Sequence, residues 1–179
     1  MKRKRKEEQN GKILAPMSGW VVPLEQVPDA VFSQKLMGDG IAIQPVDGKI
    51  YAPVSGSIIT VPETLHAYGI RTEDGLEILI HVGLDSVTLK GEGFRCHVKE
   101  GDTVTAGQQI AEVDLEILRK NDIPTITPVI LCNGVKEMSL QKADGKVKGG
   151  KDFLMALQNV SVESAEKERK KRAEIFWHL

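Results

Sequence analysis

The sequence lacks the features that mark membrane, secreted and metal-binding proteins. No apolar run approaches the roughly 20 residues that a membrane span requires. The start of the chain, MKRKRKEEQN, is basic but has no apolar secretory segment after it, so we expect a cytoplasmic protein. The two cysteines, Cys96 and Cys132, form no CxxC pair and no Cys/His ligand spacing. This excludes a zinc knuckle and a redox motif, and we expect two buried, reduced thiols.

The chain has no excess of charge of either sign, and aromatic residues are scarce. The chain has 24 basic and 25 acidic residues, and its net charge of -1 creates no field that would attract nucleic acid. Aromatic residues make up only 4% of the chain, so aliphatic side chains must fill the core. The length of 179 residues suffices for one domain with a hydrophobic core. We expect that domain at residues 11–159, between a basic tail (1–10) and a charged tail (160–179).

The two tails differ in composition. Residues 2–6 are basic but lack interleaved aromatics and an apolar face, which is typical of a solubilising tail rather than a nucleic-acid arm or a membrane helix. Residues 160–179 contain good helix formers and mixed charge, and they end in an apolar segment that includes Ile175–Trp177. They fit either a solvated segment or a helix that docks on the core or on a partner.

Short runs rich in valine and isoleucine recur along the chain, each closed by glycine, proline or aspartate. Such runs with turn signals between them predict an all-β sandwich or barrel. Two small helices are predicted at 29–35 and 114–121, the first from the start signal Pro28-Asp29. The predicted strands are 12–15, 41–44, 49–51, 57–61, 77–82, 103–104 and 109–113.

An internal repeat organises the first half of the chain. Residues 12–21 read KILAPMSGWV and residues 49–58 read KIYAPVSGSI. Each is a strand that runs into a corner, where proline removes a backbone donor and glycine permits a positive φ. A third segment, residues 100–114, places further glycines around two short strands. The repeat predicts two similar units packed face to face; the alternative is a chance similarity between two β corners.

Two of the four histidines lie where chemistry is plausible, whereas His97 and His178 are typical of structural or solvated positions. His81 ends an apolar strand and precedes Gly83, which lets the backbone turn beneath the ring. A carbonyl there could accept the Nδ1 proton and leave Nε2 unprotonated, the tautomer that a nucleophile needs. The alternative is a core histidine whose nitrogens are satisfied by hydrogen bonds.

His66 lies in a break between two strands, and the Thr64 hydroxyl can orient its ring. Two imidazoles brought together by folding could bind a metal with a third ligand, act as base and electrophile, or hold a phosphoryl group between them. A metal-dependent enzyme normally needs three protein ligands, and no HExxH helix is present, so the metal hypothesis is the weaker one. Spacing alone does not choose between the other two.

Five ordered segments together are similar to one protein family. They read VPDAVFSQKLMGDGIAI (27–43), APVSGS (52–57), ETLHAY (63–68), EILIHVGLD (77–85) and LKGEGF (89–94). From about Lys12 to Asp152 the chain resembles the glucose-type IIA component (EIIA) of the bacterial phosphoenolpyruvate:sugar phosphotransferase system. This resemblance implies an antiparallel β-sandwich with small helices, a duplicated hybrid motif.

The resemblance also implies roles for individual residues. His81 matches the residue phosphorylated on Nε2, His66 matches the partner that contacts the phosphoryl group, and Thr64 matches the residue that orients His66. No cofactor is implied for the isolated chain. In relatives zinc binds between the two histidines only when a partner supplies a carboxylate, so a metal at His66 and His81 is expected only in such a complex.

Partner-binding positions follow from the same resemblance. Asp29 and Asp85 match acidic positions that meet basic residues of the phosphocarrier protein HPr, and Val31 and Phe32 match part of an apolar docking rim. The leading hypothesis is a phosphotransferase component: HPr donates, His81 accepts, and a cysteine on the IIB domain of a sugar permease receives. The alternative is a regulatory binding module whose phosphorylation state controls permeases or kinases. A catalytically inert relative would lack one of the two histidines, and both are present.

Overall fold

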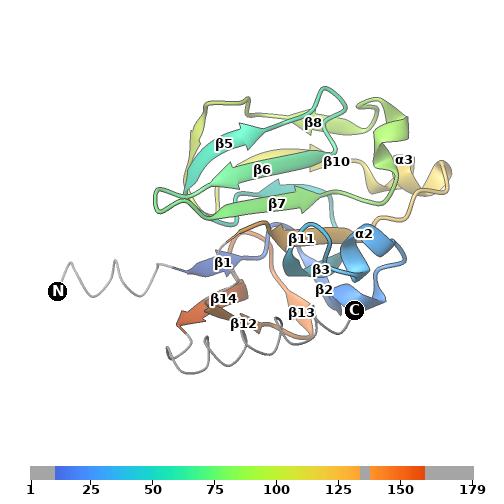
Figure 1. Cartoon of the computed structure of the whole chain (residues 1–179). Coiled ribbons are helices and arrows are strands. Elements are labelled where there is room, and N and C mark those ends of the chain that lie inside the picture. Colours follow the sequence, from blue (N-terminus) through green and yellow to red (C-terminus); the bar gives the residue numbers. More distant parts are fainter. Residues whose placement is uncertain (1–10, 134–137, 160–179) are drawn as a thin grey trace.

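The computed structural model describes residues 11–133 and 138–159, so the predicted tails, 1–10 and 160–179, lie outside the described residues. Within this part the chain is mostly β-strand with a few short helical segments, and its strands pair antiparallel in three sheets (Figure 1). The prediction of an all-β protein is confirmed. No helix in the described part is long and apolar enough to cross a membrane.

The largest sheet has eight strands in the order β13-β2-β3-β11-β7-β6-β5-β9. Their bounds are β2 (Gly19–Pro23), β3 (Asp39–Pro45), β5 (Gly56–Thr60), β6 (Ala67–Arg71), β7 (Glu77–His81), β9 (Thr103–Val104), β11 (Thr127–Leu131) and β13 (Lys146–Val147). Two three-stranded sheets have the orders β1-β14-β12 and β4-β10-β8. Their bounds are β1 (Lys12–Leu14), β4 (Lys49–Tyr51), β8 (Phe94–Cys96), β10 (Gln109–Val113), β12 (Met138–Lys142) and β14 (Phe153–Asn159).

Four short helical segments connect these strands in the described residues: η1 (Leu24–Gln26), α2 (Ala30–Ser33), η2 (Ser86–Leu89) and α3 (Leu115–Lys120). Both α-helices start on an aspartate. The Asp29 carboxylate accepts from the Val31 N–H at 2.9 Å, and the Asp114 carboxylate accepts from the Glu116 N–H at 3.0 Å. Both predicted helices and all seven predicted strands are present, each within two residues of its expected ends.

The sequence repeat is also a structural repeat. Leu14 donates its N–H to the carbonyl of Pro53 at 2.9 Å, and its equivalent in the second unit, Tyr51, donates to the carbonyl of Pro16 at 2.8 Å. Each corner therefore binds the corner of the other unit. Such reciprocal bonding agrees with the predicted packing of the two units against each other.

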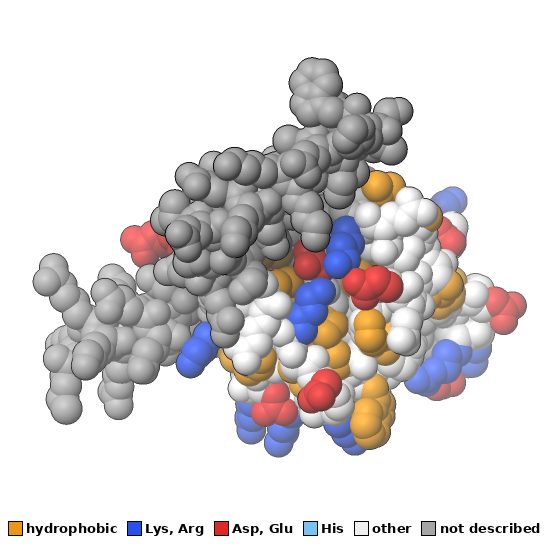
Figure 2. Space-filling model, turned by 60° about the horizontal axis from the view of Figure 1, so that its bottom comes forward, with side chains coloured by type: hydrophobic (Ala, Val, Ile, Leu, Met, Phe, Trp, Pro, Cys, Tyr) orange, Lys and Arg blue, Asp and Glu red, His pale blue; other side chains and the backbone are white. Residues whose placement is uncertain are grey.

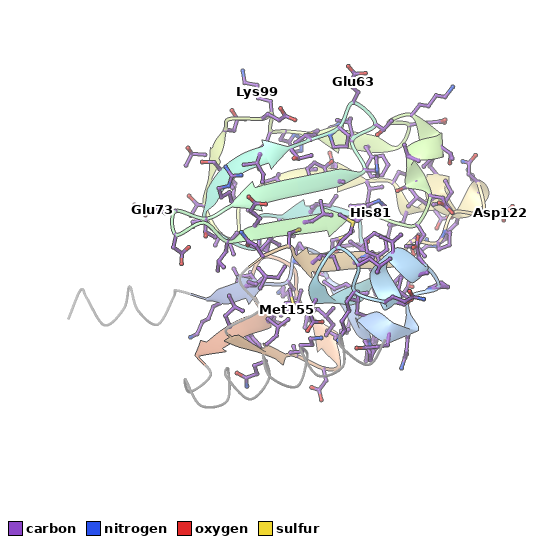
Figure 3. The ribbon with its side chains drawn as sticks, in the orientation of Figure 1. Glu63, Glu73, His81, Lys99, Asp122 and Met155 are labelled. Carbon is purple, nitrogen blue, oxygen red and sulfur yellow. The ribbon has the colours of Figure 1, made fainter. Side chains whose placement is uncertain are left out.

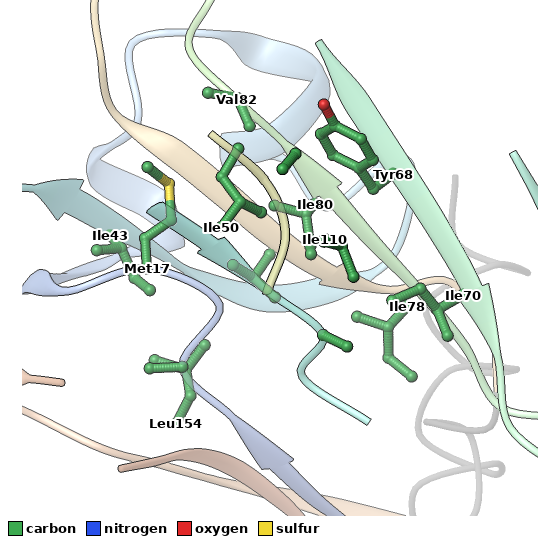
Figure 4. Packing of buried hydrophobic residues seen from close by; sticks show 14 of the residues in the cluster. Met17, Ile43, Ile50, Tyr68, Ile70, Ile78, Ile80, Val82, Ile110 and Leu154 are labelled. Carbon is green, nitrogen blue, oxygen red and sulfur yellow. The ribbon is translucent and has the colours of Figure 1, made fainter. Parts of the chain in front are cut away.

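Aliphatic side chains fill the core, as the low aromatic content predicts. Ile50 of β4, Ile80 of β7 and Ile110 of β10 are each 0% exposed and belong to one cluster to which all three sheets contribute (Figure 4). A smaller cluster, which includes Leu24 and Phe32, packs η1 and α2 against the large sheet. This second cluster matters for function because it fixes α2 beside the end of β7.

The two cysteines are both free thiols, as expected, but neither is buried. Cys96 is half-buried in β8, whereas Cys132 is exposed. The expectation of burial was wrong for both: Cys96 lies in β8, an edge strand of its sheet, and Cys132 follows the last residue of β11, Leu131.

The core makes a stability prediction. Replacing Ile110 by alanine should lower the free energy of unfolding by about 2–5 kcal/mol, because the smaller side chain leaves a cavity in the core that the sheets share. Urea unfolding followed by circular dichroism would measure the change. Val46→Ala is the control, since Val46 is 50% exposed and should cost under about 0.5 kcal/mol. Equal losses in the two variants would contradict this account of the core.

Candidate functional site

Strands β6 and β7 bring the two candidate histidines together. His81 is the last residue of β7, and Ala67, which follows His66, is its cross-strand partner. The Val82 N–H donates to the His66 carbonyl at 2.8 Å, which extends the pairing past the ends of both strands. The centroids of the two imidazole rings are 5.1 Å apart, and the rings meet edge to face at 79°. Figure 3 shows His81 where the end of β7 meets the α2 region.

Gly83 holds the His81 ring as the sequence predicted. Its carbonyl oxygen lies 2.8 Å from Nδ1 of His81, so the protonated Nδ1 donates to it. Gly83 adopts φ +76°, and a Cβ at this position would lie 2.9 Å from the Pro124 carbonyl oxygen. Another residue would therefore be strained and crowded there. When the ring is neutral, this hydrogen bond leaves the lone pair on Nε2.

The Thr64 hydroxyl holds the second ring. Its oxygen lies 2.7 Å from Nδ1 of His66, the contact that the spacing of the two residues predicted. A hydroxyl can donate to an unprotonated imidazole nitrogen and so leave the proton on Nε2. Thr64 thereby orients the His66 ring, whose edge-to-face contact with His81 is given above.

Burial favours the neutral form of both rings. It lowers the pKa of His81, whereas the Gly83 carbonyl and the carboxylates of Asp29 and Asp85 act in the opposite direction. Burial also lowers the pKa of His66, and the neighbouring His81 lowers it further. At neutral pH the site therefore presents two uncharged imidazoles with two carboxylates near one of them.

The apolar residues around the site fall into two groups. Val31 is 42% exposed, as expected for a docking rim, but Phe32 is only 4% exposed. The Phe32 ring packs on His81 with 5.1 Å between centroids, because α2 turns that side chain towards the smaller core cluster. Leu36 and Met37, which follow α2, and Val87 of η2 are further exposed apolar residues. The sequence alone did not single them out.

An ion-pair network supports the turn after α2. Lys35 lies 3.1 Å from Glu25 and 3.4 Å from Asp39, and Lys142 of β12 reaches Asp39 at 2.8 Å. Burial would raise the pKa of Asp39, but hydrogen bonds from Lys142 and the Gly40 N–H hold it below its ordinary value. Figure 2 shows one face of the molecule, on which acidic and basic side chains alternate with hydrophobic ones. The network ties the exposed Leu36–Met37 turn to two sheets.

The other described parts of the chain contain weaker candidates for a functional site. No group of three or more His, Cys, Asp or Glu side chains there could hold a metal ion. A shallow hollow of about 540 Å³ is lined by residues of β8, β10 and α3, among them Phe94, Glu112 and Ile117. Neither candidate histidine lines it, so we assign the site to the histidine pair rather than to the hollow.

The fold and the site define the class of the protein: an all-β protein that presents two facing imidazoles at the end of two paired strands. Comparison with known families then identifies it. Residues 11–136 match the family model described as phosphoenolpyruvate-dependent sugar phosphotransferase system, EIIA 1. The chain belongs to this family and is a phosphocarrier of the sugar phosphotransferase system.

Individual relatives agree. The glucose-specific EIIA component of Halalkalibacterium halodurans is 45% identical over 148 residues, which cover 82% of this chain and 85% of the relative. The glucoside-specific EIICBA component of Staphylococcus carnosus is 44% identical over 80% of this chain but only 21% of its own length. The solved glucose permease IIA from Mycoplasma capricolum matches with a TM-score of 0.75 at 40% identity, covering 80% of this chain and 93% of that one.

The charges around His81 predict its titration. In an NMR titration of the imidazole protons, the pKa of His81 should lie below the ordinary value of 6.5. Asp29→Asn should lower it further, because the change removes a carboxylate that favours the charged ring while asparagine can still cap α2. Because the pKa of His81 is lower in the folded chain than in the unfolded chain, the unfolded chain takes up the proton at a higher pH. The contribution of His81 to the free energy of unfolding is therefore lost as the pH falls below about 6.5.

Asp47→Asn is the matched control for this titration. Asp47 is also an aspartate that accepts from a backbone N–H two residues on, at 3.0 Å, but it is not among the groups that shift His81. A rise of the His81 pKa in Asp29→Asn, or an equal fall in both variants, would contradict the electrostatic account.

Proposed function

We propose that His81 carries the phosphoryl group on Nε2, receives it from phospho-HPr and passes it to the IIB domain of a sugar permease. The observation that supports this most is the 2.8 Å hydrogen bond between Nδ1 of His81 and the Gly83 carbonyl. It leaves the lone pair of a neutral ring on Nε2, and the centroid of the His66 ring lies 5.1 Å from that of His81.

The transfer is balanced in electrons and protons. The Nε2 lone pair of His81 forms the new N–P bond, and the donor nitrogen of HPr keeps the electron pair of the bond that breaks. Nδ1 retains its proton, so the phosphorylated ring is cationic. The Gly83 carbonyl and the carboxylates of Asp29 and Asp85 favour that charge. In the second transfer a cysteine thiolate of IIB forms an S–P bond, and the electron pair returns to Nε2.

His66 and Thr64 stabilise the phosphoryl group in the transition state of its transfer. With the Thr64 hydroxyl donating to Nδ1, the Nε2–H of His66 can donate to the phosphoryl oxygens. A loose, metaphosphate-like transition state leaves the protein mainly positioning and charge stabilisation to supply. A neutral donor ring suits a site that must load and unload a dianion without trapping it.

The surroundings of His81 suit a transient partner. Asp29 and Asp85 offer negative charge to a basic surface such as that of HPr, and Val31 with Leu36 offers exposed apolar area. Charge complementarity of this kind speeds encounter more than it tightens the complex. Phe32, which packs on His81, supports the rim from beneath.

The same rim favours a second function, regulatory binding to permeases or kinases according to the phosphorylation state of His81. The two roles can coexist, because any partner that covers the rim would sense the charge on that ring. A zinc ion between His66 and His81 belongs to this second role, since a partner would have to supply its remaining ligands. The carrier role needs no cofactor.

The carrier role predicts a mass change. Incubation with phosphoenolpyruvate, enzyme I and HPr should add one acid-labile phosphoryl group to the wild type and none to His81→Ala. His66→Ala should still be phosphorylated, but its transfer to a IIB domain should slow by about a hundredfold through loss of one donor. Intact mass and a quenched-flow transfer assay would measure the two effects.

His97→Ala is the control for these variants, because the exposed His97 lies 4.0 Å from Glu112 and outside the site. It should accept and transfer at the wild-type rate. An unmodified wild type in the presence of charged HPr would refute the carrier role, and the regulatory role would then be the better account.

A further inference from the structure

The turn that carries His66 contains an unusual backbone conformation. It connects β5 to β6 and is closed by the Leu65 N–H, which donates to the Pro62 carbonyl at 2.9 Å. Leu65 itself is left-handed, with φ +58°. Glycine and asparagine adopt this conformation readily, whereas leucine has no polar side-chain atom to compensate the steric cost. Something outside Leu65 must therefore hold the turn.

The hydroxyl of Tyr68 is placed to do so. It donates to the Leu65 carbonyl at 2.7 Å from a side chain that is 0% exposed. Figure 4 shows the Tyr68 ring at the edge of the aliphatic cluster, with its oxygen pointing away from the labelled isoleucines. Burial, and then the nearby Cys96, raises the pKa of Tyr68, so the hydroxyl stays protonated and remains a donor. The packing alone would be satisfied by phenylalanine.

Leu65 lies between the two residues whose contact orients the second ring. Thr64 precedes it and His66 follows it, and their side chains meet at 2.7 Å. The His66 carbonyl is anchored to β7 by the Val82 N–H at 2.8 Å. With that end fixed, the conformation of Leu65 decides where the Thr64 hydroxyl lies relative to Nδ1 of His66.

We propose that Tyr68 is a positioning residue for phosphoryl transfer: its hydroxyl holds the left-handed turn at Leu65 that sets Thr64 against His66 and the His66 ring against His81. Tyr68 touches neither the phosphoryl group nor the partner and acts through the backbone. This inference rests on the function proposed above, in which His66 stabilises the phosphoryl group during its transfer.

Tyr68→Phe tests the proposal because it removes the hydroxyl and keeps the ring. His81 should still become phosphorylated, but transfer to IIB should slow by ten- to a hundredfold, since a misplacement of about 1 Å can cost a hundredfold. The imidazole ¹⁵N shifts of His66 should move in the unphosphorylated protein, while those of His81 stay in place. Tyr51→Phe is the matched control, because Tyr51 lies in β4 with its ring against Gly150.

A rescue separates positioning from general damage to the core. Leu65→Asn places at position 65 a residue that tolerates φ +58°, so the turn should no longer depend on the hydroxyl. The double variant Leu65→Asn/Tyr68→Phe should recover most of the transfer rate that Tyr68→Phe loses. Should Tyr68→Phe unfold, the double variant still decides the question.

Two results would overturn the proposal. One is wild-type transfer together with unmoved His66 shifts in Tyr68→Phe; the other is a double variant as slow as the single one. If the wild type itself carries no phosphoryl group, the proposed function fails. The His66 shifts still decide in that case whether Tyr68 positions the ring.

Discussion

The hydrogen bond from Nδ1 of His81 to the Gly83 carbonyl is the interaction on which the rest of the site depends. It exists because β7 ends at His81 and Gly83 turns with a positive φ in a space too small for another side chain. The pairing of β6 with β7 then brings the His66 ring into an edge-to-face contact with the His81 ring. Their own ladder fixes the register of those strands, and Tyr68, Ile70, Ile78 and Ile80 anchor both of them in the aliphatic core.

Burial and charge act on His81 in opposite directions, and a carrier benefits from both. A neutral ring has a lone pair to attack with, and burial favours that form. A phosphorylated ring is cationic, and the Gly83 carbonyl with Asp29 and Asp85 favours that form. These opposing effects suit the proposed role of a protein that both accepts and releases the group.

The sequence predicted those parts of the molecule that local chemistry decides. Seven strands with valine or isoleucine between turn residues were predicted, although β2 (GWVVP) was not. The helix start at Asp29 and the Gly83 hydrogen bond were also predicted. Strand β6 was missed because four consecutive residues are buried, so polar and apolar side chains do not alternate along it. Strand β11 was missed because it contains Pro128, and a proline argues against a strand that is paired on both sides, as β11 is. The pairing of His66 with His81 came from family resemblance, since spacing does not fix tertiary contacts. The burial of Phe32 and the left-handed Leu65 depend on packing that no local pattern records.

The most direct test of the central claim is to identify the phosphorylated nitrogen. Protein labelled with ¹⁵N-histidine would be charged through HPr, and ³¹P–¹⁵N couplings would be recorded at neutral pH directly after charging, before the phosphohistidine hydrolyses. The account predicts a single phosphorylated residue, His81, with phosphorus on Nε2 and the proton retained on Nδ1. Phosphorus on Nδ1 of His81, or on His66, would contradict it, because the Gly83 carbonyl could then not be the group that directs the lone pair.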